Sequence, residues 1–119
     1  TKNKIPFINE NQSMKKAIKI INLKKLGFLV ITNSEGLTKG VFTDGDLKRL
    51  MRKNKKIENL KIKNHMSKKP FCIEENMLAS EILTQMNRRK ITNVCVFSKK
   101  NKNKTVGVIH IHDLLSNLK

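Results

Sequence analysis

Two histidines and an aspartate lie within four residues near the end of the chain. His110 and His112 are alternate residues at the end of an apolar run, and alternate residues of a strand point to one face, so two imidazoles are placed to share a metal ion. A third and a fourth ligand are missing, because His65 is far away along the chain. We therefore assign no metal site to His110, His112 and Asp113.

Aspartates precede two further apolar stretches. Asp46 comes before the apolar positions of residues 47–51, and Asp113 before those of residues 114–118. An Asp at the N-cap or in the first turn favours the helix dipole, so both residues are predicted to begin helices. Thr43, three residues before Asp46, suits the end of a strand.

Catalytic chemistry is not indicated by these residues. No nucleophile with a neighbouring base and no paired carboxylates emerge, so we assign no catalytic residue and expect this chain alone not to be an enzyme. Cys72 and Cys95 lie in apolar runs without C-x-x-C spacing and without a histidine at zinc-finger distance. We expect both to be small buried hydrophobic residues in a reducing cytosol.

These residues lie within an internal repeat, and its secondary-structure elements are expected to position them. Sliding the chain on itself by 65 residues aligns 8–33 with 73–98 without a gap, and an offset of 67 aligns Gly40 with Gly107. The identities at the first offset are Ile8/Ile73, Glu10/Glu75, Asn11/Asn76, Asn22/Asn87 and Lys25/Lys90. Asn11 and Asn76 are predicted to cap the helix that follows each of them.

Each copy is predicted to run strand, helix, strand, strand, helix. Apolar residues after Asn11 and Asn76 recur at helical spacing, and the runs 28–31, 94–97, 40–42 and 107–109 are short and β-prone. The expected fold is α/β of the α+β type, with a small sheet and two helices in each copy. Because about 55 residues bury little apolar surface, we expect the copies to pack sheet to sheet with pseudo-two-fold symmetry.

The connection between the copies, residues 53–66, is rich in Lys and Asn but carries Ile57, Leu60 and Ile62. It is predicted to be a tied-down linker that ends in a short strand. We place the first repeat at residues 1–56 and the second at residues 57–119, including the linker strand.

Composition limits the remaining classes of function. The chain has 119 residues and 38% hydrophobic residues, which suits a small globular protein. No apolar run is long enough to span a bilayer and no signal-peptide pattern opens the chain, so we expect a soluble, cytoplasmic protein without membrane contact. Because the chain starts at Thr1 rather than Met, we interpret it as a piece of a longer protein.

The net charge of +17 comes almost entirely from lysine. Lys, Asn and Ile together are abundant and have A/T-rich codons, so genome composition is a sufficient cause of much of the charge. A lysine-rich nucleic-acid-binding module remains an alternative, and sequence-specific binding is not expected.

The order of the repeat, together with the strings GVFTDGDL, RRKITNVCVF and VGVIHIHDLL, resembles the tandem CBS (cystathionine-beta-synthase) domain pair. The TDGDL and HxHDLL strings are similar to the C-terminal module of bacterial D-arabinose-5-phosphate isomerases. The resemblance covers essentially the whole chain. It implies two CBS repeats with no catalytic residue and a missing N-terminal sugar-isomerase domain.

The CBS resemblance also implies a nucleotide site whose Gly-h-x-[Thr/Ser]-x-x-Asp pattern holds a ribose. The first copy matches this pattern at Thr43 and Asp46, while the second keeps Asp113 and has His110 in place of Thr or Ser. Thr92 stands where members of the family place a hydroxyl near a ligand phosphate. Alternatively, it is simply a β-branched strand residue. We expect His110 to face the ligand and His112 to order the turn. Asp46 acts as a cap, as a ribose ligand, or as both.

The function implied is regulatory sensing of a nucleotide or nucleotide sugar within an isomerase of Kdo, lipopolysaccharide or capsule synthesis. The ligand is an adenine nucleotide or CMP-Kdo, and no cofactor is required. The alternative is a purely structural dimerisation module without a nucleotide. A homo-oligomer is expected because the two C-terminal helices of the copies carry many apolar residues: Leu47, Leu50, Met51, Leu114, Leu115 and Leu118.

Overall fold

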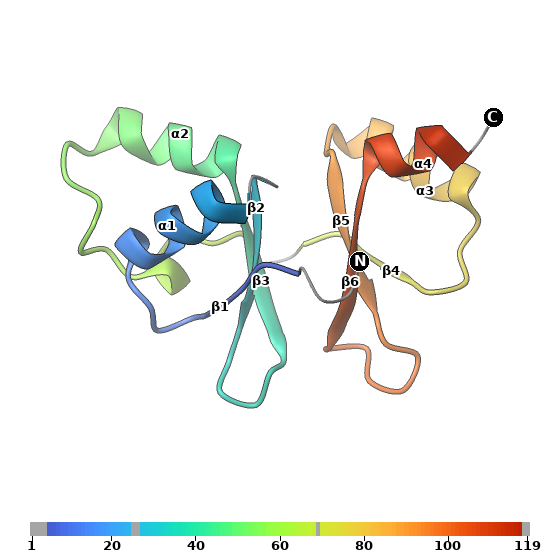
Figure 1. Ribbon diagram of the computed structural model, residues 1–119, viewed down its shortest axis with the longest axis horizontal. Coiled ribbons are helices and arrows are strands. Elements are labelled where there is room, and N and C mark those ends of the chain that lie inside the picture. The colour runs from blue at the N-terminus through green and yellow to red at the C-terminus, as the bar shows by residue number, and fades with distance from the viewer. Residues whose placement is uncertain (1–4, 25–26, 69, 118–119) are drawn as a thin grey trace. The chain divides into compact units, whose positions relative to one another are not determined.

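The computed structural model describes residues 5–24, 27–68 and 70–117. These residues form two compact units, one before and one after residue 69, which are called the first and the second unit below. Lys25 and Leu118, used in the sequence comparison, lie outside the described residues. Figure 1 shows that each unit consists of one small sheet and its helices.

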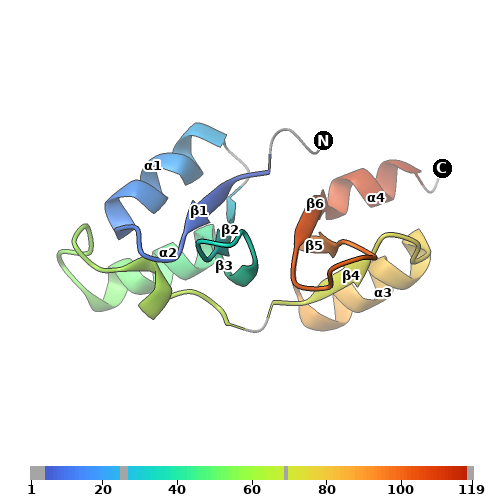
Figure 2. The same cartoon turned by 90° about the horizontal axis from the view of Figure 1, so that it is seen from below.

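The first unit contains β1 (Phe7–Asn9), α1 (Met14–Lys24), β2 (Phe28–Thr32), β3 (Thr38–Thr43) and α2 (Asp44–Lys53). Its sheet has the order β1-β2-β3, in which β1 is parallel and β3 antiparallel to β2. Both helices cover the same face of this sheet (Figures 1 and 2).

The second unit repeats this topology with β4 (Cys72–Glu74), α3 (Ala79–Arg89), β5 (Asn93–Phe97), β6 (Thr105–His110) and α4 (Ile111–Asn117). Its sheet order is β4-β5-β6, with the same parallel and antiparallel pairs. Even the irregularity in register recurs, after Ile31 in the first sheet and after Val96 in the second. The predicted order of elements and the mixed fold class are confirmed.

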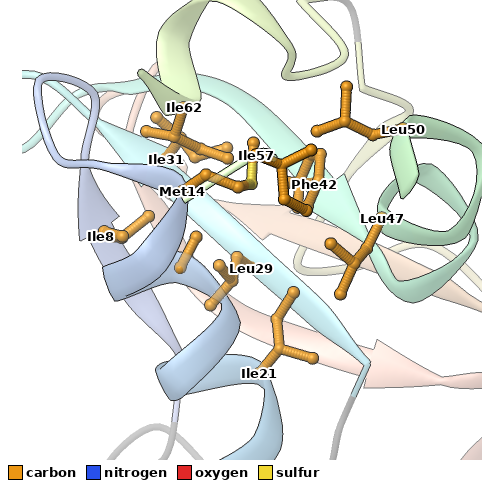
Figure 3. Packing of buried hydrophobic residues seen from close by; sticks show 11 residues of the cluster. Ile8, Met14, Ile21, Leu29, Ile31, Phe42, Leu47, Leu50, Ile57 and Ile62 are labelled. Atoms are coloured by element: carbon orange, nitrogen blue, oxygen red, sulfur yellow. The ribbon is translucent and has the colours of Figure 1, made fainter. Parts of the chain in front are cut away.

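The core of the first unit lies between the sheet and the two helices. Met14 and Ala17 of α1, together with Phe42 of β3, are fully buried there. Figure 3 shows this cluster, and its labelled members are Ile8, Met14, Ile21, Leu29, Ile31, Phe42, Leu47, Leu50, Ile57 and Ile62. The second unit has a smaller cluster built from Ile73, Ile82, Leu83, Met86, Val94, Val96 and Leu114.

The linker belongs to the first unit. Ile57 and Ile62 are buried in the first core, and Ser67 exchanges two backbone hydrogen bonds with Val41 at 2.8 and 3.0 Å. The compact units therefore divide near residue 69, and the boundary of the two sequence repeats between residues 56 and 57 stays a prediction. The expected strand at the end of the linker is instead a short 3-10 helix, Ile62–Asn64, followed by a single bridge at Ser67.

The linker also replaces a predicted helix cap. Helix α1 begins at Met14 rather than beside Asn11, and the N–H groups of Met14 and Lys15 donate to linker carbonyl oxygens of Leu60 and Glu58 at 2.7 and 3.1 Å. The Asn11 N–H donates instead to the side chain of Asn9 at 2.9 Å. The predicted capping role of Asn11 is wrong, because Ser13 Oγ accepts the Lys16 N–H at 3.3 Å and linker carbonyls accept from Met14 and Lys15.

Helix α3 likewise begins later than predicted. Its N-cap is Leu78, two residues after Asn76, and no side chain caps it. Asn76 is therefore not the cap. Among the described residues, no helix has both the length and the apolar character needed to cross a membrane.

Candidate functional site

A strand in the first unit runs directly into a helix, and this corner holds Thr43 and Asp46. Thr43 ends β3 in an extended conformation and is the N-cap of α2. Its Oγ1 accepts the Asp46 N–H at 3.1 Å, and Asp46 Oδ2 accepts the Thr43 N–H at 2.9 Å. This reciprocal capping box fixes a hydroxyl and a carboxylate side by side.

The loop before β2 closes the same corner. Gly27 has a φ of 65°, and its carbonyl oxygen accepts the N–H of Asp44, the first residue of α2, at 2.8 Å. A Cβ atom on Gly27 would lie 3.4 Å from the Asp44 Cβ. The contact is an ordinary one, so it is the positive φ that favours glycine here.

Charge in this corner is balanced locally. Asp46 Oδ1 pairs with the Arg49 guanidinium at 2.5 Å, whereas Asp44 pairs with Lys48 at 3.6 Å on the exposed side of the helix. The Asp46 side chain keeps 24% of its surface exposed and the Asp44 side chain 51%. The two first-turn aspartates thus differ in role: Asp46 belongs to the corner and Asp44 to the surface.

The second unit has the equivalent corner, at which β6 leads into α4. The Thr92 carbonyl oxygen accepts the N–H of Ile111, the first residue of α4, at 2.8 Å. The His110 N–H donates to Asp113 Oδ2 at 3.4 Å. Thr92, His110 and Asp113 are therefore brought together, with Thr92 in the place that Gly27 occupies in the first unit.

An imidazole does the capping in the second corner. His110 Nδ1 accepts the His112 N–H at 3.1 Å, and the two rings meet edge to face with centroids 4.7 Å apart. The turn is thus ordered by the His110 side chain, although the sequence suggested His112 for this task. Because Nδ1 accepts a hydrogen bond, Nε2 of a neutral His110 carries the proton.

The next question is whether side chains in the structure could hold a metal ion. Within the described ranges, no group of three or more His, Cys, Asp and Glu side chains is arranged to hold an ion. His65 belongs to the first unit, at the end of the 3-10 helix, whereas His110 belongs to the second unit.

Asn93 is a member of the second corner that sequence analysis missed. It begins β5 and pairs with His110 on β6. Its Nδ2 donates to Thr92 Oγ1 at 3.4 Å, but its Oδ1 is buried and has no hydrogen-bond donor among the described residues. A buried acceptor without a donor is costly. Sequence analysis also missed Gly27 and Arg49. Gly27 aligns with Thr92 at the 65-residue offset, and Arg49 follows Asp46 at helical spacing.

The basic end of α3 serves the protein's own structure. Lys90 is the C-cap with a φ of 57°, and the Arg89 guanidinium lies over the Phe71 ring, 4.3 Å from its centroid. A cation in this position favours the end of a helix and gains a cation–π contact.

Comparison with protein families identifies the class. The model of the CBS domain matches residues 1–53 and 61–119, and the chain therefore belongs to the CBS-domain family, with two repeats. The strand-to-helix corners described above occur once in each repeat.

Curated relatives contain the matching region as part of a longer chain. The chain is 34% identical over 97% of its length to arabinose 5-phosphate isomerase KdsD of Yersinia pestis, and 37% identical over 94% of its length to an uncharacterized protein, RP505, of Rickettsia prowazekii. It spans about a third of the length of these relatives, 34% in both cases.

Solved structures share the fold at low identity. The CBS-domain protein ATU1752 of Agrobacterium tumefaciens has a TM-score of 0.86 at 19% identity, over 97% of this chain and 84% of that one. The CBS pair of protein MJ0100, in complex with 5'-methylthioadenosine and S-adenosyl-L-methionine, has a TM-score of 0.81 at 22% identity, over 95% and 86% of the two chains. The cytosolic domain of the Mg2+ channel MgtE in complex with ATP has a TM-score of 0.79 at 14% identity, over 96% and 45%.

Proposed function

We propose that this CBS pair is the regulatory part of an arabinose-5-phosphate isomerase and binds a nucleotide or a nucleotide sugar. The identity with KdsD over nearly the whole chain supports the enzyme class. The observation that carries the ligand class is the Thr43–Asp46 corner, where a hydroxyl and a carboxylate are held in place by their own capping hydrogen bonds.

The first corner suits a ribose followed by a phosphate. A carboxylate can accept hydrogen bonds from both vicinal hydroxyls of a ribose, because its two oxygens offer about four acceptor positions. Among the described residues, Asp46 Oδ2 accepts from the Thr43 N–H and Oδ1 from Arg49, so each oxygen keeps an acceptor position. The exposed Arg49 is then free to turn toward a phosphate, since a surface ion pair holds it weakly.

The second corner offers a different set of groups. It contributes the Thr92 hydroxyl, the Nε2 atom of His110 and the carboxylate of Asp113, with the buried Asn93 Oδ1 as an acceptor that still lacks a donor. An imidazole N–H donates to a phosphate or carboxylate oxygen, and an amide oxygen accepts from an amino or hydroxyl group. The ligand for this corner therefore carries both an anionic group and a donor.

Two ligand types satisfy these requirements. Adenine nucleotides are bound by related structures, namely ATP by MgtE and two adenosyl compounds by MJ0100. CMP-Kdo is the rival, because it carries a ribose, a phosphate and a carboxylate. As an end product of Kdo synthesis for lipopolysaccharide or capsule, it would give feedback on the isomerase.

The activity itself belongs to the missing partner, the sugar-isomerase domain of a cytoplasmic parent chain. This chain alone should not interconvert ribulose 5-phosphate and arabinose 5-phosphate. Turnover that rises in proportion to the concentration of this chain would contradict that assignment.

A thermal-shift screen tests the ligand class directly. It should include AMP, ADP, ATP, S-adenosylmethionine, CMP and CMP-Kdo, with Kdo and inorganic phosphate as controls. A ligand at about 100 times its dissociation constant stabilises the native state by roughly 2.7 kcal/mol, which is a rise of several degrees in a domain of this size. The proposal fails if no nucleotide raises the melting temperature more than phosphate does.

A purely structural role in dimerisation is the second candidate, favoured by exposed apolar side chains. Met51 on α2 is 58% exposed and Leu115 on α4 is 52% exposed, whereas Leu47, Leu50 and Leu114 are buried in the cores of their own units. Light scattering at high protein concentration should then show a dimer that Met51→Ser and Leu115→Ser weaken. A monomeric mass at all concentrations would exclude this role.

A further inference from the structure

The two cysteines of the chain are direct neighbours across parallel strands. Cys72 on β4 is in register with Cys95 on β5, and neighbouring strands lie about 4.7–4.9 Å apart. That spacing falls within the range of about 4.4–6.8 Å found between the Cα atoms of disulfides. Residues in register point to the same face of a sheet, so the two thiols meet. The Cys72 thiol donates to the Pro70 carbonyl oxygen at 3.5 Å, and the neighbouring Cys95 thiol is the group that shifts the pKa of Cys72 most.

We infer that Cys72 and Cys95 form a reversible intramolecular disulfide, which makes the second unit a thiol modification site. The inference is independent of any nucleotide ligand. The sequence predicts two small buried hydrophobic residues, but only Cys95 is buried and Cys72 is half-buried.

The two thiols have different tasks. The neighbouring Cys95 thiol lowers the pKa of the Cys72 thiol despite the opposing effect of burial. The interaction between the two thiols, followed by burial, raises the pKa of Cys95 far above its ordinary value. Cys72 is therefore the attacking thiolate, accessible to a small oxidant, and Cys95 is the protonated thiol that resolves the intermediate.

The oxidant class is a peroxide. The Cys72 thiolate attacks one peroxide oxygen, the O–O bond breaks, and hydroxide leaves as Cys72 becomes a sulfenic acid. The Cys95 sulfur then attacks the Cys72 sulfur, the S–O bond breaks, and the departing oxygen leaves as water with the Cys95 proton. In total, two thiols and one hydrogen peroxide give one disulfide and two waters.

The position of the bridge is specific to the second unit. The bridge joins the edge strand β4 to the central strand β5, three residues from Thr92 in the second corner. The first unit has Phe7 and Val30 in register at the equivalent positions, so the pair is confined to the second unit.

The test uses the whole chain, which has two cysteines in total. Reduced protein is treated with one equivalent of hydrogen peroxide under native conditions, then unfolded, alkylated and weighed by mass spectrometry. The expected product is a monomer that has lost two hydrogen atoms and takes up no alkylating reagent. Dithiothreitol should restore two alkylatable thiols.

Single substitutions separate the two tasks. Cys95→Ser should leave a sulfenic acid at Cys72 that dimedone traps, and Cys72→Ser should leave Cys95 unreactive until the chain is unfolded. The inference is overturned if wild-type protein keeps two alkylatable thiols after peroxide treatment in the folded state. It is also overturned if all the disulfide found joins two chains.

Discussion

In the first repeat a threonine hydroxyl caps the helix after the third strand, and in the second repeat an imidazole does so. The carboxylate three residues later accepts the N-cap N–H in both, at 2.9 Å for Thr43 and 3.4 Å for His110. The preceding loop also closes both corners with a carbonyl at 2.8 Å, from Gly27 and from Thr92. The fold therefore requires an acceptor at this position but leaves its chemical type open, and that freedom allows the two corners to differ in ligand.

A second difference is the cover that the linker gives to the first repeat. Val41 and Phe42 of β3 are buried, whereas Val108 and Ile109, their equivalents on β6, are only half-buried. The linker bonds to β3 through Ser67 and buries Ile57 and Ile62 in the first core. We expect the first repeat to be the more stable of the two for this reason.

Loss of the linker's packing against the first core should have the largest effect on the difference in stability between the two repeats. Ile62 is fully buried, so Ile62→Ala should lower the free energy of unfolding by about 2–5 kcal/mol. Hydrogen exchange read by mass spectrometry should show the loss of protection in α1 and β3. Lys61→Ala, at an exposed neighbouring position, is the control. Equal protection in both variants would mean that the linker does not stabilise the first unit.

A pair of equivalent glycines offers a sharper comparison. A Cβ atom on Gly40 would lie 2.5 Å from the Ser67 carbonyl oxygen, whereas one on Gly107 would meet only the Val96 side chain, at 3.7 Å. Gly40→Ala should therefore destabilise the protein by about 1–3 kcal/mol, and Gly107→Ala should change stability little. Chemical unfolding of both variants measures the difference. Similar losses would refute the asymmetric role of the linker.

Removal of the two caps should lower the stability of the protein by different amounts. Thr43→Ala leaves the Asp46 N–H without its acceptor and should cost about 0.5–2 kcal/mol. His110→Ala should cost less, because the hydrogen bond that it removes, from the His112 N–H to Nδ1, lies at a more exposed site. Thermal unfolding measures both. A larger loss for His110→Ala would show that the second corner depends on its imidazole for folding.

The repeat made most of the fold predictable. Apolar positions at helical spacing and short β-prone runs placed α1, α2, α3 and α4 and the strands between them, because each copy supports the interpretation of the other. The expected sheet-to-sheet packing of the copies stays a prediction. Helix starts were the weak point. Asn11 and Asn76 are good caps by type, but Ser13 caps α1 beside the linker carbonyls, and α3 starts only after Leu78.

The corners were predictable as sequence positions but not as hydrogen-bond networks. The 67-residue offset aligns Thr43 with His110 and Asp46 with Asp113. Neither this offset nor the 65-residue offset reveals that Asn93 keeps an unpaired buried oxygen or that Cys72 lies beside Cys95, because both facts depend on strand register. A side-chain contact between two strands can be predicted only when the register of those strands is known.

Calorimetric titration of two matched variants tests most directly whether Asp46 holds the ligand. Asp46→Asn keeps an oxygen for the Thr43 N–H but removes the charge offered to ribose hydroxyls. Asp44→Asn makes the same change in the same helical turn, away from the corner, beside Lys48. With the nucleotide or nucleotide sugar that gives the largest thermal shift, Asp46→Asn should weaken binding by about 1 kcal/mol, roughly fivefold, while Asp44→Asn binds like wild type. Equal affinity in all three proteins would contradict the assignment of the ligand to this corner.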